Sequence, residues 1–316
     1  MTPSEIRIGH LSTVYHTSFI LMGTGWIEKK MDLKPVWKLF AGGPGVVRAF
    51  DNDEVDIGYV GLPPAMIGMD KGVPIKCVAG GHVEGTVFIG RKGLKSLNEL
   101  NGDMKATLQQ FKGRSIGSPP NGSIHDVIIH DLIEKTGLTR DISVKNYDWA
   151  DFIPDAMEEG ELNATVGTPP LGVIVLQTID SKMIIPPSEL WPNNPSYGII
   201  VKNELIEDSP DLIREFLRLH ENASNLIRMH PEKAAKMVSN VVRAVDKDFV
   251  LQVYKVSPKY CASLPDEFVE STLRFVPVLN KLKYILRELT EDYIFDFRFI
   301  REIHSEPPHY EEGIDI

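Results

Sequence analysis

Three corners of the chain combine a buried-strand pattern with Gly-x-Pro-Pro and could hold an anionic group. They occupy residues 60–64, 116–120 and 166–170. Proline suits the first turn of a helix because the N–H that it lacks would have no partner there. Glycine would tolerate a positive φ at such a corner. We therefore expect each corner to place a helix N-terminus, which attracts anions, just beyond the end of a strand.

The first and third corners share more than the tetrapeptide. Four residues separate Ala49 from the segment 54–56, and four residues separate Ala156 from the similar segment 161–163. This spacing predicts that one unit of helix, acidic turn, buried strand and second helix is used twice.

Helix N-termini alone would not give tight binding. Each stabilises an exposed anion by about 0.3–1 kcal/mol and a partly buried one by up to ~2 kcal/mol. Three of them supply at most about 6 kcal/mol, whereas micromolar binding requires about 8 kcal/mol. We expect the remainder from hydroxyl and amide donors and from aromatic walls. The donor candidates are Ser12, Ser118, Asn121, Ser123 and Thr168, and the wall candidates are Tyr15, Trp149 and Tyr197.

The histidines and cysteines do not indicate a metal site or a catalytic nucleophile. His82 and Glu84 would share a face if that segment is extended, but no further ligand converges on them in the sequence. Cys77 and Cys261 are the only cysteines, too few for a thiolate metal site, and whether they form a disulfide stays open. No Gly-x-Ser-x-Gly elbow occurs and no base is assigned to Cys261, so we predict no cofactor, no metal and no enzymatic activity.

Composition bounds the class of protein. The 316 residues are 42% hydrophobic and 25% charged, which is typical of a globular protein of two domains. The net charge of −10 disfavours nucleic-acid binding, since phosphate contacts need a basic face. No apolar run reaches the length of a membrane span, and the first residues lack the pattern of a signal peptide.

Strand-like and helical patterns alternate through about residue 201, which predicts an α/β fold with mainly parallel sheets. From residue 210 the apolar residues recur with helical spacing, and the tail from residue 305 is expected to be irregular. The predicted strands are residues 6–8, 35–40, 55–60, 75–79, 86–90, 115–116, 143–147, 164–167, 183–185 and 197–201.

The order of these features resembles the type II solute-binding proteins of ABC importers, in the group for nitrate, sulfonates, taurine and thiamine-pyrimidine precursors. The segments that carry the resemblance are 49–79, 112–117, 156–170 and 197–210. The resemblance implies the bilobal periplasmic-binding-protein fold. One lobe would hold residues 1–91 plus 188–316 with the C-terminal helices, and the other would hold residues 92–187. Two crossings, near residues 90–93 and 186–195, would form a hinge that lets the lobes close on a ligand.

The resemblance also implies a function and its contacts. The chain would be a monomer that captures a small anionic or polar organic ligand and delivers it to an ABC permease and its ATPase. The implied ligand contacts are His10, Ser12, Tyr15, His16, Gly61, Leu62, Gly81, His82, Ser118, Asn121, Ser123, Thr168 and Tyr197.

Two other functions stay open from the sequence. One is a cytoplasmic enzyme on the same fold, similar to the pyrimidine-precursor or naphthoate synthases. The pyrimidine synthases carry a cysteine-rich iron motif that this sequence lacks. The other is a ligand-sensing protein. We expect a cytoplasmic location if Met1 is the native start, and a periplasmic or cell-surface location if a signal peptide has been removed.

Overall fold

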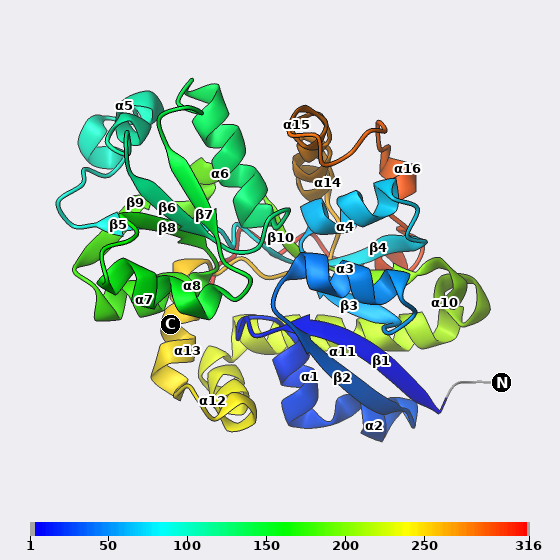
Figure 1. Cartoon of the computed structure of the whole chain (residues 1–316). Coiled ribbons are helices and arrows are strands. Elements are labelled where there is room, and N and C mark those ends of the chain that lie inside the picture. The colour runs from blue at the N-terminus through cyan, green and yellow to red at the C-terminus, as the bar shows by residue number, and fades with distance from the viewer. Residues whose placement is uncertain (1–3, 315–316) are drawn as a thin grey trace.

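Two five-stranded sheets, each covered by helices, form two lobes (Figure 1). The computed structural model describes residues 4–314. The strands of the first sheet, in spatial order, are β2 (Lys34–Phe40), β1 (Glu5–Leu11), β3 (Ile57–Val60), β10 (Pro195–Lys202) and β4 (Ile75–Val83). Those of the second sheet are β7 (Ser143–Asn146), β6 (Ser115–Ser118), β8 (Ala164–Gly167), β5 (Val87–Arg91) and β9 (Ser181–Ile185).

Both sheets are mainly parallel, as predicted, with one reversed strand each. β10 pairs antiparallel with β3 and β4, and β5 pairs antiparallel with β8 and β9. These are the two strands that the chain enters after it has crossed from the other lobe. Because β5 belongs to the second sheet, the first crossing lies at residues 84–86. The predicted lobe boundary at residue 91 does not match this pairing, since apolar strand patterns show where strands are but not which sheet they join.

The helices of each lobe follow its strands along the chain. In the first lobe they are α1 (Ser18–Thr24), α2 (Trp26–Met31), α3 (Gly43–Asp51) and α4 (Leu62–Asp70). In the second lobe and the second crossing they are α5 (Met104–Gln109), α6 (Ile124–Lys135), α7 (Ile153–Glu158), α8 (Pro169–Thr178) and α9 (Pro187–Leu190), with short 3₁₀ turns at Asn98–Leu100 and Ala150–Phe152. The predicted repeat is confirmed, since α3, β3 and α4 have the same order as α7, β8 and α8.

The corner glycines serve packing and not an unusual backbone conformation. Gly61 has φ −61 and ψ 146, and neither Gly117 nor Gly167 has a positive φ, so that prediction is wrong. A Cβ on Gly167 would lie 2.5 Å from Leu171 Cδ2, and one on Gly117 would lie 2.6 Å from Leu162 Cδ1. Side chains therefore cannot be added at these corners without displacing the core.

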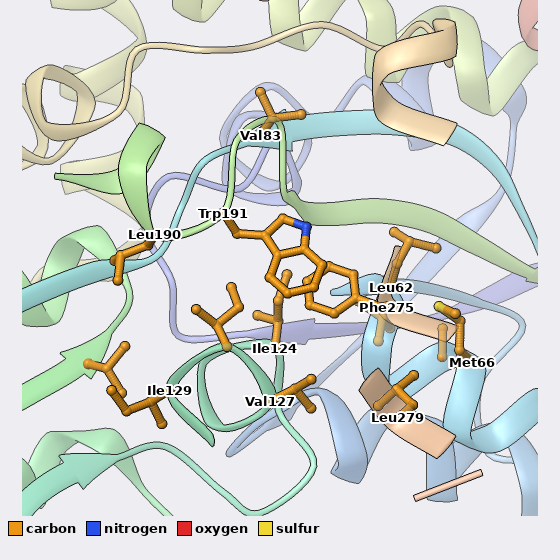
Figure 2. Packing of buried hydrophobic residues seen from close by; sticks show 14 of the residues in the cluster. Leu62, Met66, Val83, Ile124, Val127, Ile129, Leu190, Trp191, Phe275 and Leu279 are labelled. Atoms are coloured by element: carbon orange, nitrogen blue, oxygen red, sulfur yellow. The ribbon is translucent and has the colours of Figure 1, made fainter. Parts of the chain in front are cut away.

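The C-terminal third is helical and packs on both lobes. Its helices are α10 (Asn203–Asp208), α11 (Pro210–Met229), α12 (Pro231–Val242), α13 (Lys247–Val256), α14 (Asp266–Leu273), α15 (Phe275–Lys281), α16 (Glu291–Ile294) and α17 (Ile300–Ile303). In Figure 2, Phe275 lies between the apolar side chains of α4 and α6 and stacks on Trp191, with the ring centroids 3.9 Å apart. This apolar cluster joins the two lobes on one side of the space between them.

A short segment after α15 also links the lobes. The Tyr284 hydroxyl donates to Asp126 Oδ2 of α6 at 2.7 Å. The backbone N–H groups of Leu286 and Arg287 donate to the Asp70 carboxylate of α4 at 3.1 and 3.0 Å. The C-terminal region thus restrains the relative position of the lobes. No helix in the described residues is long and apolar enough to span a membrane.

Candidate functional site

A cavity of about 90 Å³ lies between the two lobes. The first lobe lines it with the loop after β1 and with the segments that open α3 and α4. The second lobe lines it with the segments that open α6, α7 and α8. The volume is well below the roughly 300–1,000 Å³ of sites for drug-sized molecules, so the cavity suits a small ligand.

Four of these helices, two from each lobe, have their N-cap residue in the cavity lining. Their N-caps are Gly42 for α3, Gly61 for α4, Ser123 for α6 and Thr168 for α8. Helix N-termini carry partial positive charge, so four of them create a field that favours an anionic or strongly polar group.

The three predicted corners all reach this cavity, but they differ in how the next helix begins. Prolines occupy the first turns of α4 and α8, as expected. The middle corner does not start a helix with its prolines, because α6 begins only at Ile124, after the Ser123 cap. Its Pro119 and Pro120 instead form part of the wall.

Prolines in the first turns also limit the backbone donors. In α8 the residues after the cap are Pro169 and Pro170, and the next N–H, that of Leu171, is directed at Thr168 Oγ1 at 3.5 Å. The lining N–H groups of Ile124 and His125 have no acceptor within residues 4–314. The N-terminus of α6 is therefore the better backbone donor, and α8 contributes mainly its dipole.

Two buried side chains on the loop after β1 have unused polar atoms at the cavity. Thr13 Oγ1 and His16 Nδ1 are enclosed and have no partner within the described part of the chain. Nearby, the Tyr15 hydroxyl and Ser196 Oγ share a hydrogen bond of 2.9 Å. A buried polar atom without a partner is costly, so this loop carries two unfavourable groups beside the cavity.

The histidines of the site are neutral. Burial, followed by the charges of His82, His10 and His220, holds the pKa of His16 well below its usual value. Burial lowers the pKa of His125 to about 3, and its Nδ1 lies 3.0 Å from Thr86 Oγ1. Neither ring therefore brings a positive charge to a ligand at neutral pH.

No lysine or arginine of residues 4–314 lines the cavity, and the single carboxylate there, Asp151, is exposed. The remaining wall is apolar and comes from both lobes. It consists of Leu11, Pro64, Pro119, Pro120, Ile124, Pro154, Pro170, Leu171 and Ile174. A ligand with a polar end and an apolar body would match both parts of this surface.

Six of the predicted contacts line the cavity. They are Ser12, Tyr15, His16, Gly61, Ser123 and Thr168. The other seven do not: His10, Leu62, Gly81, His82, Ser118, Asn121 and Tyr197. A residue in or beside a strand can point into its lobe as well as towards the cavity, and six of these seven are buried within the protein, whereas Asn121 is exposed.

Most of these seven are buried behind the cavity. His10 packs edge-on against Phe19 and Trp37, and His82 hydrogen-bonds the carbonyl of Ser257 at 2.7 Å. Tyr197 lies next to His16, with the ring centroids 4.1 Å apart. These aromatic rings support the loop after β1 from within the lobe.

The other four predicted contacts also have different environments. Leu62 is core, and Gly81 leaves room for the Tyr197 ring, which a Cβ there would meet at 2.1 Å. Ser118 is fully buried with an unpartnered Oγ. Asn121 is exposed, and its side-chain amide lies beside the Tyr284 hydroxyl. The wall candidate Trp149 is also absent from the cavity lining.

Sequence reasoning missed several lining residues. Thr13 and Ser196 are each adjacent to a predicted contact, His125 lies two residues after Ser123, and Asp151 belongs to no motif. The glycines Gly42 and Gly43 give a visible signal, since they belong to Gly-Gly-Pro-Gly before a helical pattern. That run was not assigned to the site because it matches no phosphate-binding fingerprint.

Comparisons with known proteins show the family and the fold of the chain. A model of the NMT1-like family matches residues 1–242. A protein of Bacillus subtilis (strain 168) named for binding aliphatic sulfonates is 23% identical over 312 residues, which cover 96% of this chain and 89% of that protein.

Two solved structures share the fold. The periplasmic aliphatic sulphonate-binding protein of Escherichia coli has a TM-score of 0.77 at 14% identity, covering 100% of this chain and 96% of its own. The periplasmic nitrate-binding protein of Synechocystis PCC 6803 has a TM-score of 0.76 at 12% identity, covering 96% of this chain and 89% of its own. All three relatives are named as binding proteins.

Proposed function

Because the chain belongs to the NMT1-like family, we propose that it is the solute-binding protein of an ABC importer. The fold is that of the sulfonate- and nitrate-binding proteins, and the resemblance inferred from the sequence motifs is confirmed. The proposed ligand is a small organic molecule with an anionic or strongly polar end, held between the lobes and delivered to a permease and its ATPase.

The observation that carries this proposal is the convergence of four helix N-termini, two from each lobe, on one small cavity. A ligand in this position contacts both lobes at once, so it stabilises their closed arrangement. Partial charges of the helices would balance a negative group where lysine and arginine are absent from the lining.

The apolar wall favours an organic anion over an inorganic one. Nitrate offers no carbon surface to cover Leu11, Leu171 and Ile174, whereas a short alkanesulfonate would bury a few methylene groups there. Each buried CH₂ is worth about 0.8 kcal/mol. A two- or three-carbon sulfonate should therefore bind roughly 10-fold to 50-fold more tightly than an anion without a chain.

A thermal-shift screen tests the proposal. The panel contains nitrate, sulfate, alkanesulfonates of one to four carbons, taurine, the matching carboxylates and pyrimidines. A ligand at a hundredfold excess over its Kd stabilises by about 2.7 kcal/mol, or roughly 4 °C for a chain of this size. A rise with chain length among the sulfonates supports the proposed ligand, and a flat response across the panel contradicts it.

A matched pair of variants locates the binding. Thr168→Val removes a hydroxyl that lines the cavity at the start of α8. Thr178→Val makes the same change at the far end of the same helix, where Oγ1 donates to Ile174 O at 2.8 Å. In calorimetric titration, the Kd of Thr168→Val should rise about fivefold, since one hydrogen bond contributes about 1 kcal/mol. The Kd of Thr178→Val should be unchanged. Equal effects in both would contradict the placement of the ligand.

A further inference from the structure

A cysteine and two histidines converge outside the cavity, in the C-terminal part of the chain. His304 Nε2 lies 3.6 Å and His309 Nδ1 lies 3.8 Å from Cys261 Sγ. All three ligand atoms lie within 4.8 Å of one another. Cys261 is 1% exposed and His309 is 7% exposed. Forty-three residues separate Cys261 from His304, so the sequence alone gives no sign of this cluster.

The spacing of these atoms fits a tetrahedral metal centre. Zinc binds sulfur at about 2.3 Å and imidazole nitrogen at about 2.0–2.1 Å. At tetrahedral angles these bond lengths place sulfur and nitrogen about 3.6 Å apart. The two sulfur–nitrogen distances of 3.6 and 3.8 Å are close to that value.

In each histidine, the ring nitrogen that points away from Cys261, called here the outer nitrogen, lies beside a carboxylate. Glu221 Oε1 is 3.1 Å from His304 Nδ1, and Glu306 Oε2 is 3.4 Å from His309 Nε2. In metal sites, a carboxylate beside the outer nitrogen of a ligating histidine orients the ring towards the metal. Both rings therefore direct the correct atom towards Cys261.

The thiol is also prepared for this role. The backbone N–H groups of Ser263 and His309 are directed at Cys261 Sγ, at 3.5 and 3.4 Å. The thiolate is the form of cysteine that binds metals. Near-complete burial argues against a nucleophilic role, because a substrate could not reach the sulfur.

We propose that Cys261, His304 and His309 form a structural binding site for Zn²⁺. The set of one sulfur and two imidazole nitrogens is typical of zinc and unsuited to Mg²⁺ or Ca²⁺, which prefer oxygen. A water molecule would take the fourth position. The site is independent of the ligand cavity and of the proposed transport function.

The position of the site indicates what the metal does. The Tyr310 hydroxyl already donates to the carbonyls of Cys261 and Ser263 at 2.8 and 3.0 Å. The segment that contains Cys261 pairs in turn with β4, since Gly80 N donates to Ala262 O at 2.8 Å. A bound zinc ion would fasten residues 304–310 to this edge of the first lobe and raise its resistance to unfolding.

Cobalt titration of the full chain tests the site directly. The protein is treated with EDTA, desalted and titrated with CoCl₂ under reducing conditions. We expect one equivalent of Co²⁺ to bind with a thiolate-to-cobalt charge-transfer band in the near ultraviolet and with tetrahedral d–d bands in the visible. ZnCl₂ should then displace the cobalt and abolish both. A wild-type chain with no charge-transfer band at stoichiometric cobalt overturns the proposal.

Variants assign the ligands. Cys261→Ser should lose the charge-transfer band, and His309→Ala should weaken cobalt binding at least tenfold. Cys77→Ser, which changes the other buried cysteine, should keep the full signal. A band that persists in Cys261→Ser, or one that is lost in Cys77→Ser, contradicts the assignment.

A thermal measurement on the wild-type chain keeps the test decisive even where a variant does not fold. Free zinc at a hundredfold excess over its Kd should raise the melting temperature by about 4 °C. MgCl₂ at the same concentration should leave it unchanged. Absence of a zinc-specific rise contradicts a structural metal site.

Discussion

Closure of the two lobes should be sensitive to a single methyl group at Gly42. This residue precedes α3 of the first lobe and faces Pro120 of the second. A Cβ there would lie 3.1 Å from Pro120 Cγ and 3.3 Å from Cδ. Gly42 has φ −170 and ψ 172, an extended conformation that alanine also adopts. The substitution therefore acts through the contact between the lobes and not through the backbone.

The expected magnitude follows from the crowding. Overpacking a close contact costs about 1–3 kcal/mol. Because the lobes can separate slightly, Gly42→Ala loses this energy only in the closed, ligand-bound arrangement. At the lower value of about 1 kcal/mol the Kd should rise about fivefold. The larger side chain of Gly42→Val should cause a further increase, while the free energy of unfolding should change by less than about 1 kcal/mol in either variant.

Calorimetric titration with the ligand found in the screen measures the Kd, and urea denaturation measures stability. Gly93→Ala is the matched control, since a Cβ there would have no heavy atom within 4 Å. Small-angle scattering of the protein saturated with ligand separates a wedge between the lobes from a direct clash with the ligand, because only the wedge increases the radius of gyration of the bound form. Unchanged affinity in both Gly42 variants would refute the reasoning that the lobes close at this contact.

Three further predictions concern stability. Tyr284→Phe removes a hydrogen bond to the Asp126 carboxylate and should lower the free energy of unfolding by about 1.5–3 kcal/mol in urea melts. Phe275→Ala removes the ring that stacks on Trp191 between the lobes. It should lower the free energy of unfolding by about 3–5 kcal/mol in the same assay. Burial lowers the pKa of His82 to about 4 and that of His125 to about 3. Since both rings protonate near pH 6.5 in the unfolded chain, stability should be full above that pH and should fall by about 1.4 kcal/mol per histidine by pH 5.5.

Controls for these predictions come from exposed positions. Leu286 is 89% exposed, so Leu286→Ala should leave the urea midpoint unchanged beside Phe275→Ala. For the pH series, His125→Gln should reduce the loss of stability between pH 7.5 and 5.5. A Tyr284→Phe protein as stable as the wild type would show that Asp126 is satisfied by its other partners, Gly122 and Asn146.

Local sequence patterns predicted the elements well because they depend on neighbours in the chain. The strand at residues 57–60 and the helix that starts after Gly61 follow from an apolar run, a glycine and two prolines. The same reasoning placed Thr168 at a helix start beside the cavity. The same reasoning failed for the middle corner, because the N-cap of the next helix is Ser123 and the helix does not begin at Pro119.

Which side of a strand end faces the ligand could not be read from spacing. His16 lines the cavity whereas His10, at the end of the preceding strand, packs against Phe19 and Trp37. Similarly, Ser196 lines the cavity and the adjacent Tyr197 is enclosed in the lobe. Alternate residues of an extended chain point to opposite faces, and only the packing of the lobe decides which face is inside.

The sequence by itself determined the α/β class, the order of strands and helices, the repeated unit and the helix starts that build an anion-favouring cavity, since all of these depend on residues close together in the chain. Tertiary structure alone decided that β5 joins the second sheet and that Gly42 meets Pro120. It also decided that Cys261 meets two histidines more than forty residues away. These contacts form between segments that are far apart in the sequence. They depend on how whole surfaces fit together when the lobes pack, and a local pattern of residues does not show that fit.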